Sequence, residues 1–375
     1  MTERRAAEVF PPGDFIKEEL EARNWSQAEL AEIIGREPKV VSDLVTGKRA
    51  IGPEIAKALG DAFGTSAEYW MNLHTLYQLW RTGGADDAIA RRARLYQLAP
   101  IKEMVKRHWL EWSENIEVLE QRVARFLGIV DLREPIPVQH ATRRRTHEIT
   151  PAQRAWLFRA RQLGRAVQAR PFSAGSFKHG LAELKRLLPS AQEARRVPQI
   201  LAEAGIRFVI LEHLARTRID GATLWLDEKS PVIALSLRYD RIDALWYTLS
   251  HELGHVERRD GLRQTGMLDT DLVGDEAEPA EGTAEQEADA FAAEFLVDQS
   301  ELEDFILRVR PLYGRERIRS FAHRIGVHPG IVVGQLQFRR EVPWSAFRPM
   351  LEKVRHIVVP STLTDGWGQV PPTVN

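Results

Sequence analysis

The sequence predicts a multidomain protein in which an all-α bundle is followed by a helical linker region and then by an α+β domain. Length is the first reason, because 375 residues exceed the roughly 100–200 that one domain usually holds. The second reason is that short amphipathic runs, separated by glycine and proline, fill the segment 1–80. The third is that runs rich in β-branched and aromatic residues begin only after residue 205, and helical patterns follow them.

Composition excludes several kinds of chemistry. Hydrophobic residues make up 43% and charged residues 28%, which is ordinary for a folded protein. The absence of cysteine excludes disulfides, thiolate metal sites and cysteine nucleophiles, so any metal must be held by histidine and carboxylates. The first residues lack an apolar stretch of signal-peptide length, and nowhere do eighteen uncharged apolar residues run together. We therefore expect a cytoplasmic protein with no membrane partner.

The segment 1–82 predicts a small helical bundle with a tight helix-turn-helix inside it. Ser26 and Glu29 have the spacing of a capping box, so one helix should begin at Ser26 and end near Gly35. A second should begin at Pro38, since proline suits the first helical turn. Two helices joined in this way can present the second one to the major groove of DNA. Further helices are expected over 14–23, 53–63 and 67–79.

The stretch "PGDFIKEELEARNWSQAELAEIIG", with "VSDLVTGKRAIGPEIAKALGDAFGTSAEYWMNL", resembles the XRE-type helix-turn-helix family and is similar to HigA-like antitoxin repressors. The resemblance implies double-stranded operator DNA as a partner, and a homodimer would double the footprint. It implies that Lys39, Ser42 and Asp43 face base edges, while Lys48 and Arg49 reach phosphates. Over 1–80, however, acidic side chains outnumber basic ones, so an alternative is a protein-interaction or dimerisation module.

The rest of the chain divides into a region without a chemical motif and a region that carries one. Apolar residues at helical spacing, broken at "REPIPV" and "ARPFSAGSF", predict connecting helices. Strands are expected over 206–211, 222–227 and 232–237. The expected domains are 1–82, 83–198 for the connecting helices, 199–345 for the α+β domain and 346–375 for a C-terminal tail.

A helix expected over 242–257 carries the motif. Its apolar residues lie nearly all round, which marks it as buried, yet "SHELGHV" puts three ionisable side chains in it, His251, Glu252 and His255. Residues i and i+4 share a helix face, so both imidazoles can bind one cation at roughly 2.0–2.1 Å. Glu252 is rotated by about one hundred degrees, so it can reach a metal-bound water as a base without being a ligand.

A third ligand is expected on "TAEQEADAFAAEFL", residues 283–296. Glu285 shares a face with Asp289 and Leu296, the side that a helix would bury, whereas Glu287 falls on a more polar side. We therefore choose Glu285, with Glu287 as the open alternative. Asp289, one turn on, can accept the free ring N–H of a metal-bound histidine.

The run "DGATLWLDEKSPVIALSLRYDRIDALWYTLSHELGHV", then "EQEADAFAAEFL" and "IGVHPGIVVGQLQFR", resembles the ImmA/IrrE family of zincin-like metallopeptidases. The resemblance implies a zinc (Zn2+) endopeptidase with His251, His255 and the glutamate before the A-D pair as ligands and Glu252 as base. It also implies a protein substrate, such as a repressor or an antitoxin. The alternative is a non-catalytic HigA-like repressor whose metal-site domain acts as a sensor or interaction module.

The sequence also offers candidates for two further features of the reaction. The oxyanion of the transition state needs a donor, for which Arg238 and Tyr247 are candidates near the expected strand-helix junction. The strand over 232–237 directly precedes the motif, so an extended substrate would be able to add to its edge by main-chain hydrogen bonds.

Overall fold

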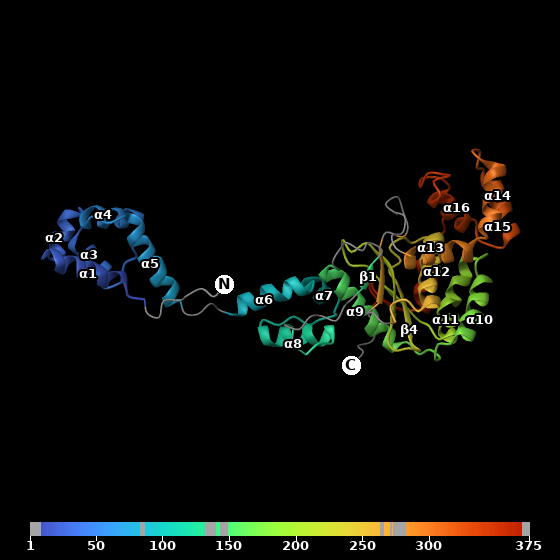
Figure 1. Ribbon diagram of the computed structural model, residues 1–375, viewed down its shortest axis with the longest axis horizontal. Coiled ribbons are helices and arrows are strands. Elements are labelled where there is room, and N and C mark those ends of the chain that lie inside the picture. The colour runs from blue at the N-terminus through green and yellow to red at the C-terminus, as the bar shows by residue number, and fades with distance from the viewer. Residues whose placement is uncertain are drawn as a thin grey trace. The chain divides into compact units, whose positions relative to one another are not determined.

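A computed structural model gives the fold of two compact units, Met1–Arg91 and Arg92–Asn375, and each unit has an apolar core of its own (Figure 1). The expected boundary after residue 82 falls near this division. The structure describes residues 9–82, 87–130, 132, 140–142, 149–262, 266–270, 272 and 283–369.

The first unit is the expected all-α bundle around a helix-turn-helix. The capping box forms, since Ser26 Oγ accepts from the Glu29 N–H at 3.2 Å and Glu29 Oε2 accepts from the Ser26 N–H at 2.7 Å. Leu30, Leu59 and Trp70 are fully buried in its core. The helices are α1 (Pro12–Arg23), α2 (Gln27–Ile33), α3 (Pro38–Val45), α4 (Pro53–Phe63) and α5 (Ala67–Arg81).

A mixed sheet organises the second unit, which confirms the α+β class. Over the described residues the sheet has six strands in the order β1-β5-β3-β4-β2-β6. β2 runs parallel to β4 and β6, whereas β3 is antiparallel to β4 and β5. The strands are β1 (His140–Thr142), β2 (Arg207–Leu211), β3 (Ile219–Trp225), β4 (Pro231–Leu235), β5 (Gly266–Thr270) and β6 (Leu363–Asp365).

The three expected strands are β2, β3 and β4. All three lie inside the sheet, and this corrects one expectation. β4 pairs with β3 on one side and with β2 on the other, and all its residues are buried. Its backbone groups are therefore used, so an extended substrate cannot add to the strand expected over 232–237. An uninterrupted apolar run is typical of such an interior strand.

Two of the helices expected to be connectors, α9 and α11, cover the sheet instead. α9 packs directly on β4, since a Cβ built on Gly164 would lie 2.7 Å from the methyl carbons of Val232. Trp109 Nε1 donates to Asp365 Oδ2 of β6 at 3.0 Å, which ties the preceding helices to the sheet. The helices of the region expected as connectors are α6 (Asp87–Leu98), α7 (Ile101–Lys106), α8 (Ile116–Leu127), α9 (Pro151–Ala166), α10 (Ala174–Lys185), η1 (Ala191–Arg196) and α11 (Val197–Ala204).

The segment expected as a tail, 346–375, also belongs to this framework as far as it is described. It forms η2 (Arg348–Met350), α17 (Arg355–Val358) and η3 (Val359–Ser361), then β6, which pairs with β2. Its last residues, 370–375, lie outside the described part. A three-residue strand is too short to show a period of its own, which is why no pattern predicts it.

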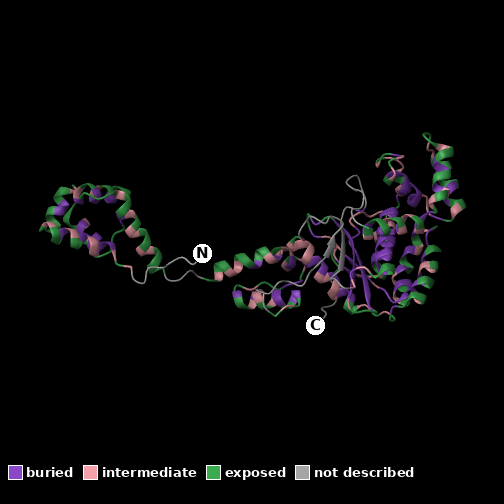
Figure 2. Cartoon of the chain, viewed as in Figure 1, coloured by how far each residue is buried: buried purple, intermediate pink, exposed green. Residues whose placement is uncertain are grey.

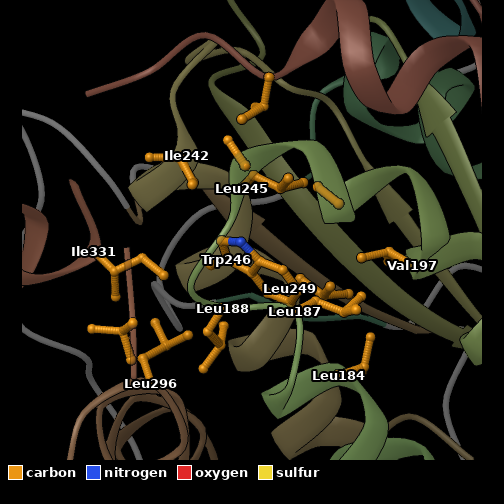
Figure 3. Close-up of a cluster of buried hydrophobic side chains, with 14 of the residues drawn as sticks. Leu184, Leu187, Leu188, Val197, Ile242, Leu245, Trp246, Leu249, Leu296 and Ile331 are labelled. Carbon is orange, nitrogen blue, oxygen red and sulfur yellow. The ribbon is translucent and has the colours of Figure 1, made fainter. Parts of the chain in front are cut away.

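The helix that carries the predicted histidine pair packs against the sheet. α12 (Ile242–Arg258) contacts β3 and β4 and packs most extensively against α13 (Thr283–Leu296). Its residues are almost all buried (Figure 2), and Figure 3 shows Trp246 and Leu249 inside the main apolar cluster. Among the described helices, none is long and apolar enough to span a bilayer. The remaining helices are α14 (Gln299–Val309), α15 (Arg315–Ile325) and α16 (Pro329–Phe338).

Candidate metal centre

α12 buries three ionisable side chains completely. His251, Glu252 and His255 are each 0% exposed. The helix is held in place by its other faces, where Trp246 and Leu249 pack into the apolar core. Because burying polar groups without partners is costly, the contacts of these three side chains should explain their presence.

Three side chains converge on one point. His251 Nε2 lies 3.1 Å from His255 Nε2, and Glu285 Oε2 lies 3.3 Å and 3.7 Å from these two nitrogens. The possible ligand atoms of all three residues lie within 4.8 Å of one another. Glu287 is exposed and forms an ion pair with Arg258 instead. The geometry therefore brings Glu285, and not Glu287, to the histidines.

Each imidazole is oriented by a carboxylate on its far side. His251 Nδ1 lies 2.9 Å from Asp289 Oδ1, and His255 Nδ1 lies 3.0 Å from Asp260 Oδ2. Burial opposes ionisation of Asp260, but hydrogen bonds from His255 and Arg258 outweigh it and hold its pKa below the ordinary value. Since an ionised carboxylate can only accept, both Nδ1 atoms are the donors. In neutral rings, both Nε2 atoms then point lone pairs toward each other.

This arrangement calls for a positive charge at its centre. Two imidazole lone pairs and a carboxylate repel one another in a dry interior unless a cation lies among them. Both carboxylate oxygens of Glu285 are buried without a hydrogen-bond partner among the described residues. Two histidine nitrogens and one carboxylate are the donor types that hold zinc at catalytic sites, with one coordination position left open. The residues present therefore fit a divalent cation of this kind.

Glu252 lies beside this set rather than in it. Thr223 Oγ1 donates to Glu252 Oε2 at 2.6 Å, so β3 holds the carboxylate. Gly221, two residues earlier on the same face of β3, makes room for it, since a Cβ there would lie 2.3 Å from Glu252 Oε1. Sequence reasoning missed Thr223, Gly221 and Asp260. The sequence shows Gly221 and Thr223 two residues apart where a strand is expected to begin, but no local pattern indicates which strand packs on α12.

The two candidates for the oxyanion donor have other partners. The Tyr247 hydroxyl donates to Asp289 Oδ1 at 2.9 Å. The Arg238 guanidinium binds the Asp220 carboxylate at 3.0 and 3.3 Å. Tyr247 thus joins the group that orients His251, and its role as a donor to a substrate stays a prediction, as does that of Arg238.

A second candidate site lies on the first unit. Lys39 and Ser42 are exposed on α3, and Asp43 is partly buried beside them. Lys48 and Arg49 are exposed in the turn that follows, where both their backbone N–H groups donate to the Asp43 carbonyl, at 2.8 and 3.0 Å. The five predicted residues therefore lie on one helix and the turn after it.

Comparison with known proteins finds similarity over the two segments that contain the candidate sites. A family profile described as helix-turn-helix matches residues 16–70, and one described as IrrE N-terminal-like domain matches residues 203–336. An uncharacterized HTH-type transcriptional regulator of Escherichia coli, YddM, is 40% identical over 68 residues, which are 18% of this chain and 72% of that protein. An uncharacterized HTH-type regulator of Haemophilus influenzae is 30% identical over 97 residues, 26% of this chain and 85% of that protein. Among solved structures, the Pseudomonas aeruginosa antitoxin HigA with the higBA promoter matches 20% of this chain and 83% of its own, at 34% identity and a TM-score of 0.20.

Proposed function

We infer the function from the family, since the chain belongs to the helix-turn-helix transcriptional regulators and also carries an IrrE N-terminal-like domain. We propose that it is a DNA-binding regulator with a zinc-dependent endopeptidase centre. The observation that carries this proposal is the buried meeting of His251, His255 and Glu285, with a carboxylate behind each imidazole. Histidines that serve only in packing, or charged side chains that only face solvent, would not need three converging side chains with a carboxylate behind each imidazole.

The protein side chains divide the work of peptide hydrolysis among them. His251, His255 and Glu285 would hold the metal, and Asp289 and Asp260 keep the two imidazoles in the binding tautomer. When bound, zinc supplies Lewis-acid chemistry, since it polarises a peptide carbonyl and acidifies water. Glu252 takes the proton of the attacking water and returns it to the leaving amine, while Thr223 holds the carboxylate in place.

The first unit would direct this chemistry to an operator. Lys39, Ser42 and Asp43 lie where α3 would meet base edges, and Lys48 and Arg49 where the turn would meet phosphates. A homodimer would bind two half-sites one helical turn of DNA apart. The protein substrate would be a regulator such as a repressor or an antitoxin, which places the reaction in the cytoplasm with the chromosome.

The peptidase proposal is tested with Glu252→Gln. We expect this variant to keep about one zinc per chain, because Glu252 is not among the three converging ligands, and to lose cleavage by at least a hundredfold, because the base is gone. Metal content is measured by elemental analysis. The substrate is identified by using the variant as a trap and sequencing the captured protein by mass spectrometry.

Two results would count against the peptidase proposal. Undiminished cleavage of the captured protein by Glu252→Gln would show that the base is another residue. A gently prepared wild-type chain without zinc, and without cleavage when zinc is added, would leave the non-catalytic repressor as the better description.

The DNA proposal is tested with Lys39→Ala combined with Arg49→Ala. Removing Lys39 takes away a base contact and should weaken operator binding. Removing Arg49 takes away a phosphate contact and should also lower the slope of log affinity against log salt by roughly one per bound protomer. Gel-shift titration at several salt concentrations measures both quantities. Lys57→Ala, a cation on α4 outside the predicted DNA-contacting set, is the matched control. If the double variant binds like the control, the first unit is an interaction module instead.

A further inference from the structure

An apolar pocket opens one helical turn from the metal centre, between α12, α13 and α16. It holds about 380 Å³ of space not filled by atoms, its open mouth included. Leu296 and Ile331, which Figure 3 shows at the margin of the main apolar cluster, form part of its wall. Aromatic side chains complete it, since the rings of Tyr247 and Phe338 lie 5.8 Å apart and Trp344 stands at the same pocket.

The pocket is joined to the candidate centre through one hydrogen-bonded chain. Tyr247 donates to Asp289 at 2.9 Å, and Asp289 lies 2.9 Å from His251 Nδ1. Tyr247 precedes His251 by four residues, which is about 6 Å along a helix. Two residues of an extended peptide span about 6.6 Å. A substrate lying over the centre would therefore place a side chain at this pocket about two residues from the bond being cleaved.

The walls of the pocket indicate what kind of side chain it takes. Asp243 is buried there, but the Arg241 guanidinium binds it at 3.1 and 2.5 Å. Gln335 Nε2 donates to the Ala293 carbonyl at 3.3 Å. Because these polar groups are engaged by the protein itself, the surface that remains for a ligand is apolar.

The chain itself puts a leucine in this environment. Leu272 is 1% exposed and packs against Ala244, Tyr247 and Trp344. A leucine side chain is thus already accommodated against the aromatic rings of this pocket, where Leu272 forms part of the wall.

We propose that this pocket binds an apolar side chain of the protein substrate, of the leucine, methionine or phenylalanine type, about two residues from the cleaved bond. The proposal rests on the proposed endopeptidase function. It makes the pocket a determinant of specificity, since an acidic or basic side chain would lose its hydration there without finding a partner.

Binding is tested first, without any turnover. The full-length chain is labelled with 5-fluorotryptophan, and the Trp344 resonance is assigned with Trp344→Phe. N-acetyl-leucinamide and N-acetyl-phenylalaninamide should shift this resonance in a saturable way, and N-acetyl-aspartate amide should not. Phe338→Asp should weaken the apparent affinity at least tenfold, whereas Phe338→Leu should change it less than threefold. Both changes fall on a side chain that is 39% exposed, and Leu307→Asp, at a residue 80% exposed on α14, is the matched control.

Cleavage specificity is tested second, with a peptide library derived from a whole proteome. Cleaved sites should be enriched in apolar residues two positions from the bond, and Phe338→Asp should abolish this enrichment while Leu307→Asp retains it. Cleavage with no such enrichment, or enrichment that survives Phe338→Asp, would overturn the pocket assignment and leave the endopeptidase intact. An aspartate amide that shifts Trp344 as well as leucine does would also overturn it. No cleavage by any form would instead reject the endopeptidase, and the substrate assignment with it.

Discussion

Glu252 depends on two residues of β3 that are neither ligands nor bases. Thr223 binds one oxygen of its carboxylate, and the missing side chain of Gly221 lets the strand approach it closely. A carboxylate that is buried but loosely held would have to be reoriented for every proton transfer, so a fixed carboxylate lowers the barrier. The position of Glu252 is therefore set by the strand above it as much as by its own helix.

Thr223→Val tests whether Glu252 depends on its hydrogen bond from Thr223. Valine keeps the shape of threonine and removes the donor, and a hydrogen bond to a charged group contributes about 1.5–3 kcal/mol. We expect kcat for cleavage of the natural substrate to fall roughly ten- to a hundredfold, with KM and zinc content nearly unchanged. Thr223→Ser, which keeps the hydroxyl, should restore most of the rate. A valine variant with full activity would mean that Glu252 needs no such support.

At the scale of elements, the centre is made by the packing of α13 against α12. Glu285 and Asp289 face the same way on α13, one turn apart, so one helix supplies both a candidate ligand and the hydrogen-bond partner of His251. Gly254 permits the close approach, because a Cβ there would lie 3.1 Å from the Cα of Ala288. The two helices form one functional element, although the whole segment 259–282 separates them in the sequence.

The stability of the first unit depends on the cap at the start of α2. Ser26→Ala removes the side chain that caps this helix and should destabilise the first unit by about 0.5–2 kcal/mol. Ser26→Asp keeps an acceptor at the same position and should retain most of the stability. Calorimetry of the full chain measures the melting of this unit. Equal melting temperatures for wild type and the alanine variant would show that the cap contributes nothing.

At the scale of the whole molecule, we expect metal to change the melting transition of only one of the two compact units. The proposed metal would bind folded α12 and α13 in the second unit, so chelation should lower the melting transition of that unit. Zinc at about a hundred times its Kd should raise this transition by about 2.7 kcal/mol of stability. Magnesium, which prefers oxygen ligands, is the control and should change nothing.

The assignment of the two transitions is checked with Ser26→Ala. The transition that this variant lowers should be the one that chelation leaves in place. If zinc fails to stabilise either transition, the three converging side chains hold no metal.

Local pattern by itself determined much of this protein. The serine and glutamate of the α2 cap, the helical spacing of α12 and α13 and the apolar runs of β2, β3 and β4 are all readable within a few residues of chain. The same reasoning favoured Glu285 over Glu287, because the 3.6-residue period of a helix puts Glu285 on its buried face, but it left Glu287 open as the alternative. The helix-turn-helix, the histidine pair and the helix that carries Glu285 and Asp289 were therefore predictable before any coordinates.

Only the tertiary structure decided how these parts meet. Asp260 reaches His255 because the chain turns back at the end of α12, and Thr223 reaches Glu252 because β3 crosses that helix. β6 joins β2 from the far end of the unit's sequence, and β4 lies inside the sheet rather than at its edge. Periodicity records which face of an element is apolar, but it does not record which distant element covers that face. Long-range pairing is decided by the packing of the whole unit, so the residues that position the candidate centre could be found only there.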